Sequence, residues 1–195
     1  MKLLSRISAA MKFAATGRLS ASAFEGAMQN RRLIAWKATQ ENINTLLASG
    51  GELLRARARQ IVRSNPYAAN AADSFVANAV GAGIVPSSLI TDTALKDELQ
   101  RVWLAWTDEA DADDLTDFYG MQALAARAMF EAGECFVRFR PRRPEDGLTV
   151  PLQLQLLEAE HLPFEKNETS SNGNQIRCGI EFDKIGRRVA YHFYR

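Results

Sequence analysis

Histidine and cysteine are scarce in this sequence, which has two of each among its 195 residues. Cys135 and Cys178 have no C-x-x-C partner, which argues against a disulfide framework or a zinc site and favours a reducing, intracellular setting. No apolar run approaches the roughly 18 residues of a membrane-spanning helix. The sequence also contains no Walker loop, G-x-S-x-G or G-x-G-x-x-G motif. We therefore expect no membrane span, no metal or cofactor and no catalytic residues.

Neither sign of charge is in excess, since the formal net charge is +1. Any contact with nucleic acid must therefore come from a local patch rather than from the field of the whole protein. Residues 1–28 are the one biased segment, because four basic residues precede the first acid: Lys2, Arg6, Lys12 and Arg18. Their composition also suits an organelle transit peptide, whereas the charges interrupt the apolar core that a secretory signal needs. We interpret this segment as a mobile basic arm.

Helical periodicity dominates residues 29–132, the predicted helical region. A first helix is expected over residues 30–48, ended by Ser49-Gly50-Gly51. Further helices are predicted at about 53–64, 66–80, 94–107 and 118–132. The helix at 66–80 should be capped by Ser64 or Asn65, with Pro66 in its first turn, and end at Gly81. The helix at 94–107 should be capped by Asp92 or Thr93, and the helix at 118–132 should be capped by Asp117 and end at Gly133.

Each predicted helix carries an apolar stripe that we expect to face the core. Trp103 and Trp106 share one helix face, where core packing is a simpler explanation than stacking on a base. The stripes of the two central helices are Leu54, Ala58, Ile61 and Val62 in the first, and Ala68, Ala71, Ala72, Phe75, Val76 and Ala79 in the second.

The period changes from 3.6 to 2 after Gly133, which predicts an antiparallel β region over residues 133–195. Strands are expected at about 134–140, 151–157, 176–182 and 189–193, with a polar hairpin loop or insert at 167–174 and a tight turn at 183–187. The fold class is therefore α+β, with a helical N-terminal half followed by an antiparallel sheet. Because the last residues still read as strand, we expect the chain to be a fragment truncated at its C-terminus.

Two sets of residues could carry chemistry or contacts. Glu134, Glu158, Glu160 and His161 could form the site of a metal-dependent hydrolase, although their spacing matches no metal motif. His192 is expected at a surface or interface.

A basic row could bind phosphates or pair with acids of another subunit; its members are Arg55, Arg57, Arg59 and Arg63. The acidic loop 108–114, with Asp111, Asp113 and Asp114, supplies charges of the opposite sign for such a pairing between subunits. A solvated helix face and a solvated loop are the simpler alternatives.

The run LLRARARQIVRSNPYAANAADSFVANAVGAGI at residues 53–84 resembles the N-terminal portion of portal proteins of lambda-like tailed phages and prophages. The matching residues, which read as fold-determining, are Arg57, Arg59, Arg63, Asn65, Pro66, Tyr67, Asn78, Val80, Gly81, Gly83 and Ile84. The resemblance continues through Trp103 and Trp106, residues 117–120, Gly133-Glu134, LQLQLLEAEHL at 152–162 and the hairpin at 179–192.

The resemblance implies a structural protein rather than an enzyme. Portal proteins form a ring, usually a dodecamer, at one capsid vertex, where they nucleate head assembly with capsid and scaffold proteins. The ring also docks the large terminase subunit, passes double-stranded DNA without reading its sequence and holds the head-tail connector. The location implied is the portal vertex of the virion, and the host cytoplasm during assembly.

Family members extend into stem, clip and crown segments that are absent here, so this chain would be mostly wing. The alternative from a different class is an intracellular α+β domain that binds nucleic acid through its arginine-rich helix.

Overall fold

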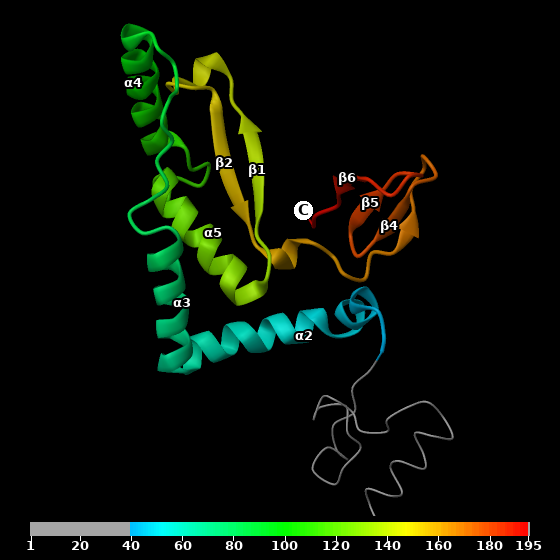
Figure 1. Ribbon diagram of the computed structural model, residues 1–195. Helices are drawn as coiled ribbons and strands as arrows, with labels where there is room; N and C mark the ends of the chain where they lie inside the picture. The colour runs from blue at the N-terminus through cyan, green and yellow to red at the C-terminus, as the bar shows by residue number, and fades with distance from the viewer. Residues whose placement is uncertain (1–39, 195) are drawn as a thin grey trace, which may run out of the picture. The chain divides into compact units, whose positions relative to one another are not determined.

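Helices precede two antiparallel sheets in the computed structural model of the chain, which describes residues 40–194 (Figure 1). The helices are α2 (Ile43–Ser64), α3 (Pro66–Ala79), α4 (Thr93–Glu109) and α5 (Phe118–Ala132). The strands and 3₁₀ turns are β1 (Phe136–Pro141), η2 (Pro144–Asp146), β2 (Leu152–Leu157), η3 (Ala159–His161), β3 (Glu168–Thr169), β4 (Gln175–Arg177), β5 (Ile180–Phe182) and β6 (Arg188–Tyr191). This order confirms the predicted α+β class. The predicted arm, residues 1–28, lies outside the described residues.

The prediction that Ser49-Gly50-Gly51 ends a helix is wrong, because α2 continues through these residues. Gly51 is buried against the ring of Phe164, and a Cβ at this position would lie 3.3 Å from the nearest ring atom. A helix can tolerate a glycine at a cost of about 1 kcal/mol, and here the missing side chain permits a close packing contact. The first part of the predicted helix, residues 30–39, lies outside the described residues.

The buried face of α2 differs from the predicted apolar stripe. Leu54 and Ile61 are exposed, whereas Gly51, Arg55 and Val62 are buried. The helical period is as predicted, but which face of α2 is buried depends on the elements that pack against it. Opposite α2 lie carboxylates and the Phe164 ring, so the buried face is partly cationic.

The predicted stripe of α3 is also less buried than expected. Ala72 is fully buried, but Ala71 and Ala79 are exposed, and Phe75 keeps 41% of its surface exposed. Phe75 contacts Phe130 of α5 at a ring-centroid distance of 5.2 Å. Because α3 packs on α2 and α5, part of its apolar surface has no covering element within the described residues.

The helix caps follow the predictions, since they depend on side chains adjacent in sequence. The Asn65 side chain accepts a hydrogen bond from the Tyr67 backbone N–H, with Pro66 in the first turn. Asp92 caps α4, Asp117 caps α5, and Gly133 ends α5 in the left-handed conformation. The C-cap of α3 is Val80, one residue before the predicted stop at Gly81.

An aromatic cluster joins α4 to α5. The Trp103 and Trp106 rings lie 5.1 Å apart and contact the Phe118 ring at 5.3 and 5.2 Å. Trp106 is buried, and its indole N–H donates to the carbonyl oxygen of Leu152 at 2.7 Å. Both tryptophans therefore pack inside the chain, as expected from the sequence. The hydrogen bond of Trp106 also holds the start of β2 against α4.

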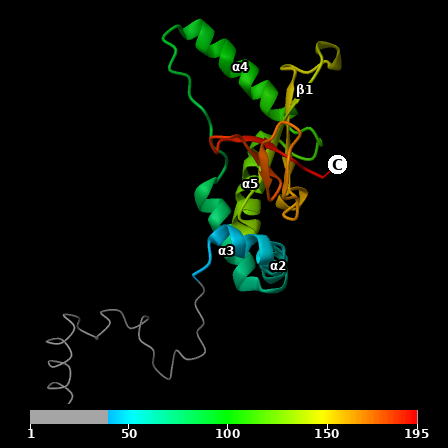
Figure 2. The ribbon, with the colours of Figure 1, turned by 90° about the vertical axis from the view of Figure 1, so that its right-hand side faces the viewer.

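The glycines after α3 permit a close contact with α5. Gly83 adopts a φ of 114°, and a Cβ there would overlap the Tyr119 ring. Beside it, the Gln122 side chain bonds both the N–H and the carbonyl oxygen of Ile84, at 2.6 and 3.1 Å. The connection then continues as an extended segment to α4, which both views show (Figures 1 and 2).

Strands β1 and β2 form a two-stranded sheet, with Phe139 opposite Leu154. The other edge of β2 is covered by the loop after α4, because Leu154 forms a parallel bridge with Asp111. The Ala112 N–H donates to Leu154, and the Leu154 N–H donates to Ala110. This loop, β2 and β1 therefore lie side by side, with β1 as the outer strand.

The prediction of a single strand over residues 176–182 is wrong, because the chain reverses at Cys178-Gly179. These residues have φ values of 49° and 74°, and Arg177 pairs directly with Ile180. Two adjacent positive φ values are typical of the tight turn that joins hairpin strands. The predicted sheet is consequently two sheets, β1-β2 and β3-β4-β5-β6. The polar segment 167–174 contributes β3 and the β3–β4 turn.

None of the described helices is long and apolar enough to cross a lipid bilayer.

Adjacent glycines in α2 provide a matched test of the Phe164 contact. Gly50→Ala should stabilise the fold by about 0.5–1 kcal/mol, because nothing lies within 4 Å of a Cβ there and alanine favours the helix. Gly51→Leu should destabilise it by about 1–3 kcal/mol through overpacking against Phe164. Urea unfolding followed by circular dichroism measures both, and equal effects at the two positions would contradict the packing assignment.

Candidate functional site

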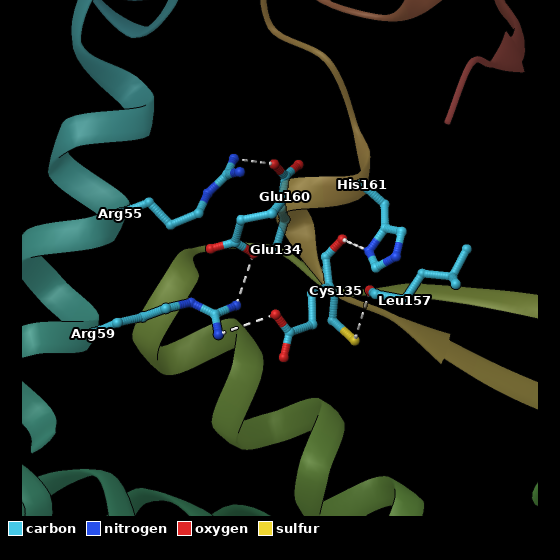
Figure 3. A network of polar contacts seen from close by, with 8 residues as sticks. Arg55, Arg59, Glu134, Cys135, Leu157, Glu160 and His161 are labelled. Carbon is cyan, nitrogen blue, oxygen red and sulfur yellow. Dashed lines mark hydrogen bonds and ion pairs between the residues drawn. The ribbon is translucent and has the colours of Figure 1, made fainter. Parts of the chain in front are cut away.

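An ionic cluster joins α2 to the base of the β1–β2 hairpin. Arg55 Nη2 lies 2.9 Å from Glu134 Oε1, while Arg59 Nη1 and Nη2 lie 3.3 Å from Glu158 Oε2 and 2.9 Å from Glu160 Oε2. Figure 3 shows both arginine side chains reaching from α2 toward the carboxylates. We call these five residues the Arg–Glu cluster.

Local structure explains how these side chains meet. Arg55 and Arg59 are four residues apart and so lie on one face of α2. Glu134 follows the Gly133 cap of α5, and Glu158 and Glu160 lie at the end of β2 and in η3. The three glutamates that the sequence analysis grouped into one possible site do lie around the same face of α2, but two arginines lie among them.

Burial and an aromatic ring shape the electrostatics of the Arg–Glu cluster. Arg55 is 7% exposed, and its guanidinium lies over the Phe164 ring at 4.8 Å from the centroid. Burial raises the pKa of the Glu134 carboxyl, Arg55 opposes that rise, and the charge of Glu160 adds to it. Arg59 Nε is buried and has no hydrogen-bond partner among the described residues.

The cluster does not favour the predicted metal-dependent hydrolase. Among the described residues no group of three or more His, Cys, Asp or Glu side chains is placed to hold a metal ion. Arg59 occupies the space between Glu158 and Glu160, and His161 is exposed, with Nδ1 3.3 Å from the carbonyl oxygen of Glu158. This arrangement is a structural connection between elements.

The predicted arginine row is divided by its environment. Arg55 and Arg59 point into the chain and pair with acids, whereas Arg57 and Arg63 are exposed and have no ion-pair partner among residues 40–194. The nucleic-acid-binding alternative relied on this arginine row. Only half of that row remains open to a phosphate or to another subunit.

The predicted acidic loop is divided in the same way. Asp111 is 7% exposed, and its carboxylate accepts hydrogen bonds from the backbone N–H groups of Asp113, Leu115 and Thr116. Asp111 therefore organises the loop. The simpler alternative, a solvated loop, does not hold for this residue. Asp113 and Asp114 are exposed, and Asp113 Oδ1 accepts a hydrogen bond from Gln155.

A second polar cluster holds the C-terminal segment to the β3–β4 turn. Glu181 is buried and accepts hydrogen bonds from Asn174 and Ser170, and His192 Nε2 lies 2.9 Å from its other oxygen. The bond from Asn174, followed by that from His192, lowers the pKa of Glu181. His192, expected at a surface or interface, is thus engaged inside the chain.

Sequence reasoning missed Phe164, which contacts both Gly51 and Arg55. No local signal marks it, because its partners lie more than a hundred residues away in the chain. A signal for the ionic contacts did exist in the four-residue spacing of Arg55 and Arg59, but it does not specify whether the partner is a carboxylate of the same chain, a phosphate or another subunit.

Arg55→Met should destabilise the fold by about 1–3 kcal/mol, because half-buried Glu134 would lose its partner. Arg57→Met removes the same charge from an exposed position of α2 and should change stability by no more than about 0.5 kcal/mol. Thermal or urea unfolding of the two variants checks this difference. Equal stability would mean that the Arg55–Glu134 pair does not hold the hairpin to α2.

Glu134→Gln should reveal the raised pKa of Glu134. A carboxyl whose folded-state pKa is raised favours folding when protonated, so its contribution is present below about pH 4 and is lost as pH rises through the folded pKa. Wild-type stability should therefore fall relative to Glu134→Gln between about pH 4 and 7. Urea unfolding across this range measures the difference, and a relative gain by the wild type would show that Arg55 outweighs burial.

Comparison with known proteins gives this geometry a context. The family described as "Phage portal protein, lambda family" matches residues 29–195, which include every element that the structure describes. No curated protein matches the chain. The matched family is one of structural proteins of the virion, located at the portal vertex, in agreement with the resemblance seen in the sequence. This chain belongs to the lambda family of phage portal proteins.

Proposed function

We propose that the chain is a subunit of a closed portal ring, a dodecamer by analogy with its family, at the unique vertex of the capsid. The observation that carries the proposal is the family match over residues 29–195. In this function the ring nucleates head assembly with capsid and scaffold proteins, docks the large terminase subunit and holds the head-tail connector. These steps take place in the host cytoplasm before the ring becomes part of the virion.

The exposed surface supports a function in assembly. Large apolar side chains remain exposed on every described helix, including Leu54 and Ile61 on α2, Leu95 on α4 and Leu124 on α5. Monomeric proteins seldom leave extended apolar surface open to water, whereas association surfaces do. Neighbouring subunits or capsid proteins would cover part of this surface.

Double-stranded DNA passing such a ring would be contacted through its phosphates. Arg57 and Arg63 are the members of the predicted row that stay exposed, and they are our candidates for this contact. Binding through phosphates depends on charge and not on base sequence, and it weakens as salt is added.

Light scattering and negative-stain electron microscopy of the purified chain test the proposed ring. We expect a discrete high-order species with a closed circular outline, because heterologous contacts between identical subunits close into rings when the rotation permits. A chain that stays monomeric at all accessible concentrations would contradict a ring built by these residues.

A further inference from the structure

Strand β1 and the turn after it carry arginines that no acid neutralises. Within the described residues, no carboxylate forms an ion pair with any of them, and we call this set the basic strand: Arg138, Arg140, Arg142 and Arg143. Arg140 and Arg142 donate instead to the neutral Gln155 and Gln153 side chains, at 3.2 and 2.8 Å. Arg138 and Arg143 are exposed. These glutamines orient the guanidinium groups without cancelling their charge.

The basic strand lies on a sheet edge to which no further strand is paired among the described residues, and the C-terminal segment lies beside the start of β1, where Phe136 contacts Tyr191 and Phe193 at ring-centroid distances of 5.6 and 5.0 Å. β1 pairs only with β2 in the part of the chain that the structure describes. An unpaired edge offers backbone N–H and C=O groups to another chain, and charged side chains limit indiscriminate pairing there. A partner with the opposite charge would meet no such barrier.

Exposed acids lie across the same small sheet. Asp108, at the end of α4, and Asp113 and Asp114, in the loop that pairs with β2, are exposed, and we call these three residues the acidic corner. None of them has an ion-pair partner among residues 40–194. Because Leu154 pairs with Asp111 on one side and with Phe139 on the other, β2 lies between the acidic corner and the basic strand. Gln155 of β2 bridges them at one point, since it accepts a hydrogen bond from Arg140 and donates one to Asp113.

We propose that the acidic corner of one copy of this chain contacts the basic strand of the next copy. Opposite charges on two edges of one sheet suit a head-to-tail contact, in which two different surfaces meet and repetition produces a ring. Arg55 and Arg59 are already paired within the chain, and Arg57 and Arg63 are two open arginines on α2, whereas the basic strand gathers four arginines without an acid partner among the described residues. The inference rests on the proposed ring and identifies the surfaces that close it.

A charge swap tests the contact on the purified full chain. Arg138→Glu with Arg142→Glu places acid against acid, and Asp108→Arg with Asp113→Arg places base against base. Each pair should weaken subunit association at least about tenfold, as loss of close interfacial charge pairs does elsewhere. The four substitutions combined restore opposite charges and should recover the wild-type mass in light scattering, with association falling at high salt.

Arg177→Glu with Lys184→Glu is the matched control, because it reverses the same number of exposed basic residues in the β3–β6 region, away from β1. We expect it to leave the mass unchanged, while thermal unfolding confirms that every variant is folded. The inference is overturned if both charge-reversal pairs keep the wild-type mass, or if the combined variant stays as dissociated as either pair.

The same variants distinguish a neighbouring subunit from double-stranded DNA as the partner of the basic strand. If Arg138→Glu with Arg142→Glu keeps the oligomer but loses binding to double-stranded DNA, the strand contacts phosphates and the proposed subunit contact is wrong. Rings that persist in all variants would overturn this inference and leave the proposed function standing. A wild-type chain that never associates would overturn both.

Discussion

Two arginines on one face of α2 determine where the helical region meets the β region. A guanidinium that is as buried as that of Arg55 needs an anion nearby, because the cost of removing it from water is otherwise not offset. Glu134 supplies that anion at the junction of α5 and β1, and Glu158 and Glu160 do the same for Arg59 at the end of β2. The ends of three elements are thereby held at α2, and the Phe164 ring closes over the same place.

Outside this junction, large side chains buried in a hydrophobic core contribute little to holding the described elements together. No large side chain among the described residues is fully buried, and the hydrophobic residues that are buried include several alanines, such as Ala72, Ala110 and Ala159. Contacts between elements are made by aromatic rings, by Gln122 bonding the backbone of Ile84, and by the Arg–Glu cluster. The chain therefore leaves apolar and charged surface exposed, which suits a member of a portal family.

Local features were predictable because their causes lie within a few residues. The cap residues Asn65, Asp92, Asp117 and Gly133 act on backbone groups of the same turn, so the starts of α3, α4 and α5 and the end of α5 follow from the sequence. Features that depend on distant partners were not predictable in this way. Gly51 lies inside α2 and packs against Phe164, and the strand expected over residues 176–182 folds back at Cys178-Gly179 to pair with itself.

The sequence alone determined the α+β order, the helix caps and the family, since periodicity, capping chemistry and a long ordered series of motifs can be read along the chain. Only the tertiary structure decided which charges remain available. Arg55 and Arg57 are both arginines and lie two positions apart in α2, yet Arg55 is buried against Glu134 and Arg57 is exposed. That difference arises because a helix turns successive side chains to different surroundings, and the surroundings of α2 come from residues 134–164.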